Sequence, residues 1–218
     1  MLLYQWQGQK FWLNANRIIF WENENTLIAS DLHIGKTGHF RKNGIGIPQD
    51  IFKEDMQRLF AALQYYNPQR ILLVGDLFHS LANKELDWFA RWRAQFCHIV
   101  FVLVKGNHDI LPPIWYQQNE IIVVENHIEN RLLFIHDQAD SGQAPLALNG
   151  IKATVSGHLH PSVSVPVGPK QQVNLPCYYF SEKACILPAY SHFTGTHQIR
   201  PQKNDAVFVI TGQEVIRL

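Results

Sequence analysis

Short continuous apolar runs alternate with segments of helical periodicity through the first half of the chain. The runs 27–30, 71–74 and 99–104 have the length of strands rather than helices, which predicts buried strands. After the first run, Pro48 opens a segment whose apolar residues share one helical face. After the second, a helix is predicted to begin near a cap at Asn83. The order β, α, β, α, β is that of an α/β protein.

The remaining apolar segments predict strands. Residues 2–6, 10–13 and 17–21 are rich in aromatic side chains and separated by turn residues, which predicts antiparallel strands at an edge of the first sheet. Beyond Asp109 no long helix is evident, and the pattern predicts a mostly antiparallel sheet. Its predicted strands are 121–125, 131–135, 151–156, 163–167, 173–180, 184–187, 206–210 and 215–218.

Composition bears on the number of domains, the possible partners and the cellular compartment. A chain of 218 residues with 46% hydrophobic content can form one sizeable core, which predicts a single domain over 1–218. The net charge of +1 gives no overall field for nucleic acid or a membrane, so any nucleic-acid contact must be local. Three unpaired cysteines, Cys97, Cys177 and Cys185, indicate reduced packing residues, and the absence of a leader or a membrane-length apolar run indicates a cytoplasmic protein.

Candidate metal ligands follow the predicted strands. The carboxyl ends of strands are where open α/β sheets keep their chemistry, so these side chains are expected to share one site. Aspartate and histidine together suit manganese, iron, cobalt or zinc, and the candidates are more than one ion can use. Two divalent transition-metal ions are therefore predicted, with Asp76 the best bridge between them. The candidates are Asp31, His33, Asp76, Asn107, His136, His158 and His160.

The ordered motifs Asp31-x-His33, Gly75-Asp76, 106–109, His136 and Gly157-His158-x-His160 resemble the signature of calcineurin-like metallophosphoesterases, over roughly residues 27 to 160. The resemblance implies a four-layer α-β-β-α sandwich of two mixed sheets. It implies His108 as the acid that meets the leaving oxygen. It also implies two ligand sets, one of Asp31, His33, Asp76 and His160, the other of Asp76, Asn107, His136 and His158.

Two further features resemble nucleases within that family. His79 stands where many phosphatases of this fold have aspartate, as in SbcD-type DNA repair nucleases, whose equivalent histidine lies near the scissile phosphate. The stretches 29–36 and 104–112 are similar to the small bacterial metallophosphoesterases encoded beside a DNA ligase and a helicase. This second likeness implies a manganese-dependent phosphodiesterase and DNA endonuclease in DNA repair. Its substrate would be single-stranded or damaged DNA, with a ligase and a helicase as functional associates.

The mechanism expected from this resemblance is in-line attack by a metal-bridging hydroxide, with His108 protonating the departing alkoxide. His79 would steady His108 or bind a phosphate oxygen. A basic loop leaves the site and either tracks a DNA backbone or is a solvated turn. Its candidate substrate contacts are Lys36, His39, Arg41 and Lys42.

Other interpretations remain open. A small-molecule or nucleotide phosphoesterase could use the same two-metal site, and a narrow pocket would favour it. A non-catalytic protein-binding scaffold is a third possibility, against which the intact set of site residues argues. Asp109 and Asp137 are expected to cap loops or orient neighbours rather than bind metal. Trp88 and Trp92, at helical spacing, are expected to pack against neighbours, although they could stack on bases.

Overall fold

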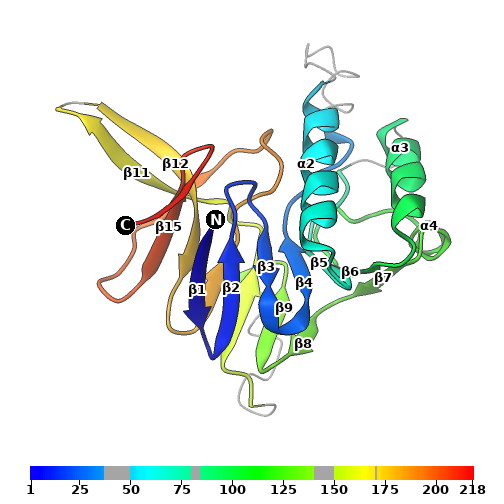
Figure 1. The fold of residues 1–218 in the computed structure, drawn as a ribbon, viewed down its shortest axis with the longest axis horizontal. Coiled ribbons are helices and arrows are strands. Elements are labelled where there is room, and N and C mark those ends of the chain that lie inside the picture. The colour runs from blue at the N-terminus through cyan, green and yellow to red at the C-terminus, as the bar shows by residue number, and fades with distance from the viewer. Residues whose placement is uncertain (37–49, 80–83, 140–149, 170) are drawn as a thin grey trace.

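A computed structural model describes residues 1–36, 50–79, 84–139, 150–169 and 171–218. The first sheet has the strand order β1-β2-β3-β4-β5-β6-β7 (Figure 1). Strands β1 to β4 are antiparallel neighbours, as predicted for the aromatic N-terminal segments, and β4 to β7 are parallel. The segment 121–125, predicted as a strand of the second, mostly antiparallel sheet, instead forms β7 at the edge of the first sheet, parallel to β6. The strands are β1 (Leu2–Trp6), β2 (Gln9–Leu13), β3 (Ile19–Trp21), β4 (Thr26–Ala29), β5 (Arg70–Val74), β6 (Val100–Val104) and β7 (Ile121–Val124).

Helices connect the parallel strands of this sheet. Helix α2 (Asp50–Tyr66) joins β4 to β5, and α3 (Lys84–Arg93) joins β5 to β6, continuing as a 3-10 turn at Ala94–Phe96. The predicted starting residues, Pro48 and Asn83, lie outside the described residues. A short helix, α4 (Pro113–Gln118), was not predicted, because in six residues only Tyr116 is buried and no periodicity can show. A 3-10 turn, Glu22–Glu24, precedes β4.

The second sheet has the order β14-β11-β12-β13-β10-β9-β8, with β15 pairing β12 and β16. The pairs β8 with β9, β11 with β12, β12 with β13, β12 with β15 and β15 with β16 are antiparallel, as predicted. Strand β10 pairs in parallel with both β9 and β13, and β14 pairs in parallel with β11, which corrects the prediction for these strands. Strands β8 and β14 were not predicted. The strands are β8 (His127–Glu129), β9 (Leu132–Ile135), β10 (Ala153–Ser156), β11 (Pro161–Gly168), β12 (Gln171–Phe180), β13 (Ala184–Ile186), β14 (His197–Gln198), β15 (Ala206–Ile210) and β16 (Val215–Arg217).

The core has a layer on each side of the first sheet. Between the two sheets lie large buried side chains such as Trp21, Phe134 and Phe208, and on the other face α2 and α3 bury Leu59 and Phe89. Helices α2, α3 and α4 all lie on one side of the molecule (Figure 1). The predicted α/β class with two mixed sheets is therefore confirmed.

The outer face of the second sheet is covered differently from the first. No helix follows α4 within the part of the chain that the structure describes. Instead Val163, Cys177, Val207 and Val209 form a small apolar cluster there. Cys177 and Cys185 are buried packing residues, as predicted, whereas Cys97 is exposed. None of the described helices is long and apolar enough to cross a membrane.

If the layer between the sheets is the main core, truncating a side chain inside it should cost much more stability than truncating an exposed side chain on the neighbouring strand. Phe208 is fully buried, whereas Ile216 on the adjacent strand is 46% exposed. Phe208→Ala should lower the free energy of unfolding by about 3–5 kcal/mol, because it leaves a cavity. Ile216→Ala should change it by only about 0.5 kcal/mol. Urea unfolding of both variants measures this, and equal losses would show that the inter-sheet layer is not the main core.

Candidate metal centre

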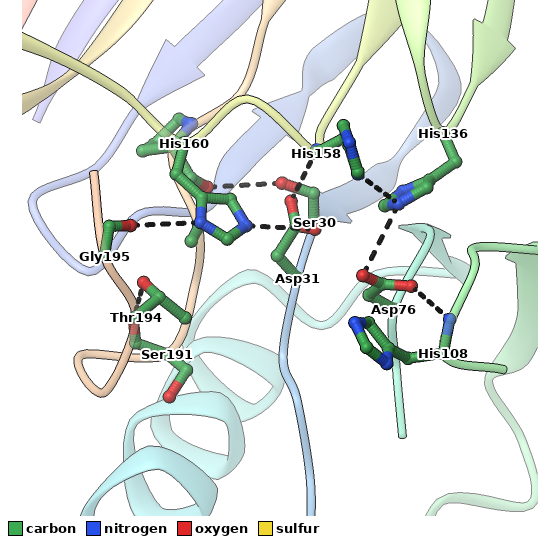
Figure 2. A network of polar contacts seen from close by, with 12 residues as sticks. Ser30, Asp31, Asp76, His108, His136, His158, His160, Ser191, Thr194 and Gly195 are labelled. Atoms are coloured by element: carbon green, nitrogen blue, oxygen red, sulfur yellow. Dashed lines mark hydrogen bonds and ion pairs between the residues drawn. The ribbon is translucent and has the colours of Figure 1, made fainter. Parts of the chain in front are cut away.

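The candidate ligands lie just beyond the ends of strands from both sheets. Strands β4, β5 and β6 are parallel neighbours in register, so the residues that follow them meet at one sheet edge. Asp31, Asp76 and Asn107 occupy those positions. In the second sheet, β9 and β10 end side by side, followed by His136 and by His158 with His160. The face-to-face packing of the sheets brings the two edges together (Figure 2).

The structure divides these side chains into two groups that could each hold an ion. One group is Asp31, His33 and His160, and the other is Asp76, His136 and His158. Within each group the candidate ligand atoms all lie within 4.8 Å of one another. Nε2 of His160 is 3.3 Å from Oδ1 of Asp31, and Nε2 of His136 is 3.4 Å from Oδ2 of Asp76. The structure thus brings together six of the seven candidate ligands, with Asn107 in neither group. Their assignment as ligands and the bridging role of Asp76 stay predictions.

Unsatisfied buried atoms show that these residues fit a metal. His33 is only 6% exposed, and neither of its ring nitrogens has a hydrogen-bond partner in the structure. Buried polar atoms in folded proteins are nearly always satisfied, and coordination to an ion would satisfy one nitrogen of His33. Burial also lowers the pKa of His33 to about 3, so the ring is neutral and its lone pair is available to a metal.

The carboxylate of Asp76 is held in its charged form. Burial alone would raise its pKa, but the hydrogen bond and charge of His136 and the backbone N–H of His108 together outweigh burial and lower it. That N–H donates to Oδ1 at 2.8 Å. The pKa of His136 is correspondingly raised, because its interaction with Asp76 outweighs the effect of burial. Asp76 is therefore a permanent negative charge at the meeting point of the two sheets.

The backbone at the candidate ligands is in a conformation that residues with a side chain rarely adopt. Five of them have left-handed φ values between 49° and 61°. Such a conformation costs roughly 1–3 kcal/mol per residue and tends to occur at functional sites. In both Asp31-x-His33 and His158-x-His160 the two ligands of the pair adopt it. The five residues are Asp31, His33, Asp76, His158 and His160.

Glycines lie against these ligands because no other residue would fit. A Cβ added to Gly75 would lie 1.8 Å from Nδ1 of His136, and one added to Gly157 would lie 2.5 Å from Oδ2 of Asp31. Gly75 also has a φ of +79°. Both glycines occur in the sequence motifs, but the sequence alone assigns them no role. The structure shows that they allow the ligands of one sheet to approach the backbone of the other.

Two aspartates next to candidate ligands hold the loops in place. Asp109 is buried, and its carboxylate accepts the backbone N–H groups of Gly106 at 2.8 Å and Phe78 at 3.1 Å. It therefore ties the loop after β6 to the loop after β5, as expected for a residue that orients neighbours. Burial raises its pKa to about 6. Asp137 accepts the N–H of Ala139 and lies 3.6 Å from Nε2 of His158.

A segment near the C-terminus, residues 188–195, supports the first ligand group, and sequence reasoning missed it. Nδ1 of His160 lies 3.0 Å from the carbonyl oxygen of Gly195, which can only accept a hydrogen bond (Figure 2). That contact places the proton on Nδ1 and leaves the lone pair of Nε2 facing Asp31. The segment also bonds Ser30 and Asp31 through backbone N–H groups. Because it acts through its backbone, its side chains carry no motif.

The two predicted catalytic histidines lie together beside the first ligand group. The ring centroids of His79 and His108 are 4.4 Å apart, and each is within 5.7 Å of that of His33. His108 and Asn107 are exposed. Lys36 is half-buried and lines a small cavity with His33. The other predicted substrate contacts, His39, Arg41 and Lys42, lie outside the described residues.

This fold, with two Asp–His groups at the ends of its strands, defines a hydrolase of the metal-dependent phosphoesterase class. The chain belongs to the calcineurin-like phosphoesterase family, whose model matches residues 25–138. The structure is similar to that of the Pseudomonas putida nuclease MPE, with a TM-score of 0.80, 24% identity and 99% of each chain covered. A weaker match is to YfcE, a phosphoesterase from E. coli, with a TM-score of 0.45 and 14% identity. That match covers 88% of this chain and 97% of YfcE. Comparison with curated proteins gives no significant match.

A side chain at Gly75 would both clash with His136 and strain the backbone, and a matched glycine elsewhere separates these two effects. Gly8 has the same φ of +79°, but a Cβ there would meet nothing within 4 Å. Gly75→Ala and Gly8→Ala should share a strain of about 1–2 kcal/mol. Only Gly75→Ala should also displace His136 and reduce the manganese bound per chain, measured by elemental analysis after gel filtration. Equal metal content in the two variants would contradict the assignment of His136 as a ligand.

Proposed function

We propose that this protein is a phosphodiesterase that uses two divalent transition-metal ions, most readily Mn²⁺, and cuts DNA internally. The observation that carries the proposal is the pair of adjacent ligand groups, Asp31 with His33 and His160 and Asp76 with His136 and His158, with His108 beside them. The fold likeness to a protein described as a nuclease supports a nucleic acid as the substrate. Asn107 is proposed to complete the second ligand set.

The chain's own residues have distinct parts in this reaction. When bound, the two ions would lower the pKa of a water molecule and neutralise charge on the phosphate. Asp76 fixes the backbone of His108 through its 2.8 Å hydrogen bond, so the exposed imidazole stays beside the site. His108 gives a proton to the departing oxygen of the cleaved ester. His79, with its ring 4.4 Å away, positions His108 or binds a phosphate oxygen.

The openness of the site supports a long substrate. Asn107, His108 and His158 are all exposed, so one side of the ligand groups faces solvent. A polymer could pass along this side, whereas a small-molecule phosphoesterase would gain from enclosure. Phosphate contacts by basic residues such as Lys36 would position a strand without reading its sequence. We propose single-stranded or damaged DNA as the substrate, and a DNA ligase and a helicase as functional associates.

The unsatisfied nitrogens of His33 also bear on the scaffold alternative. A protein that only binds partners has no need for a buried imidazole without a hydrogen bond, since replacing it by an apolar residue would increase stability. Such a protein also has no need for the strained left-handed backbone found at five ligand positions. Both features are explained by metal binding, which supports an enzyme.

Circular single-stranded DNA tests the proposal, because a closed circle can be cut only internally. With Mn²⁺, the wild type should convert the circle to linear strands. Asp76→Asn should abolish cleavage and reduce bound metal, because a neutral amide replaces the charged ligand. His108→Asn should keep its metal and slow cleavage by about 10²- to 10⁴-fold, the usual contribution of a general acid.

Metal content and activity distinguish the outcomes. Equal loss of metal in Asp76→Asn and His108→Asn would contradict the separate roles of these residues. If the wild type hydrolyses a small phosphodiester but leaves the circle intact, DNA is the wrong substrate. In that case the small-molecule phosphoesterase becomes the better explanation.

A further inference from the structure

Helices α2 and α3 begin at the same edge of the first sheet as the candidate ligands. Both cross back from the carboxyl end of one parallel strand to the start of the next, so their first turns lie near that edge. Phe52 and Met56 lie in the first two turns of α2, and Trp88 lies in the second turn of α3. Both helices lie on the same side of the molecule (Figure 1).

An aromatic groove of about 310 Å³ runs between these two helices. The Trp88 ring is 42% exposed and lies 5.7 Å from the buried ring of Phe52, with an angle of 31° between the ring planes. Trp92 lies one turn further along α3 and is held by the rings of Phe89 and Phe96. The exposed residues Lys53 and Gln57 add polar groups at the groove. The residues that line it are Phe52, Lys53, Met56, Gln57, Trp88 and Trp92.

The groove lies next to a small cavity at the metal centre, and the two share lining residues. Phe52 and Met56 line both the groove and the small cavity that also contains His33 and Lys36. A strand whose phosphate lay beside His33 could therefore place a neighbouring base between α2 and α3. The groove suits a base because its walls are aromatic or apolar and its rim carries an amide and an ammonium group. A base has the complementary form, with flat apolar faces and a polar edge.

We propose that this groove is a nucleobase subsite, in which Trp88 stacks on one base of a single-stranded DNA substrate. The inference rests on the proposed function, because it assumes a DNA strand at the metal centre. It assigns Trp88 a role beyond packing: the residue would contribute affinity for the strand and no contact with the reacting atoms. Stacking tolerates any base, so the subsite would not impose a sequence preference.

Binding of two oligonucleotides tests this directly. One is a fluorescein-labelled 12-nucleotide thymidine strand, and the other has the same backbone without bases. Anisotropy is measured with Mn²⁺ in the full chain carrying His108→Asn, which prevents rapid cleavage. Trp88→Ala should weaken binding of the thymidine strand by roughly 5- to 150-fold, the range found for base–aromatic stacking, and leave the abasic strand unaffected. Trp88→Phe should retain most of the affinity.

Tyr65→Ala is the matched control. Tyr65 is a 73% exposed aromatic residue on α2, the helix that carries Phe52. It lies 13 positions from Phe52, or about 20 Å along the axis. This variant should bind both strands like the parent protein. Metal content and thermal unfolding of Trp88→Ala should match the parent, which shows that the fold is intact.

Two negative results have separate meanings. In the first, the wild type cuts DNA, and Trp88→Ala either binds both strands normally or loses the same affinity for both. The base subsite is then wrong and the nuclease proposal stands. If the wild type neither binds nor cuts DNA yet hydrolyses a small diester, the nuclease proposal itself fails.

Discussion

The structure depends on the packing of two sheets whose strands end at a common edge. Each sheet alone supplies an incomplete set of polar side chains, with two carboxylates, His33 and an amide from the first and three histidines from the second. The apolar layer that contains Trp21, Phe134 and Phe208 holds the sheets in register. The positions of the candidate ligands therefore follow from hydrophobic packing several residues away, which is far stronger than any contact among the ligands themselves.

The site stores unfavourable energy without a bound ion. Left-handed backbone at five ligand positions costs several kcal/mol at roughly 1–3 kcal/mol each. The unpaired ring nitrogens of His33 add to this. An ion that binds only the folded state would offset these costs, so metal binding and stability are linked. The same rigidity serves catalysis, because ligands fixed by sheet packing and close glycine contacts need little rearrangement when substrate arrives.

Much of the fold and of the site follows from local sequence patterns. The strands of the first sheet, the two long helices and most strands of the second sheet were predicted, because continuous apolar runs and helical spacing report burial directly. The sequence motifs also singled out the side chains that the structure gathers into two groups, Asp31, His33, Asp76, His136, His158 and His160. Short elements such as α4, β8 and β14 could not be predicted, since too few of their residues are buried to produce a pattern. The parallel arrangement of β9, β10 and β13 is a matter of topology that local patterns do not encode. The support of His160 by Gly195 is equally invisible, since any residue has a backbone carbonyl.

That support from Gly195 has a consequence for how the protein matures during synthesis. The first ligand group joins Asp31 to His160, and both are held by a segment around residue 190. Contacts between such distant parts of the chain form late, because a long loop must close before they can. A nascent chain that has exposed only its first 160 residues holds all seven candidate ligands but lacks the segment that supports Asp31 and His160. The centre can acquire its final geometry only once residues 188–195 have left the ribosome.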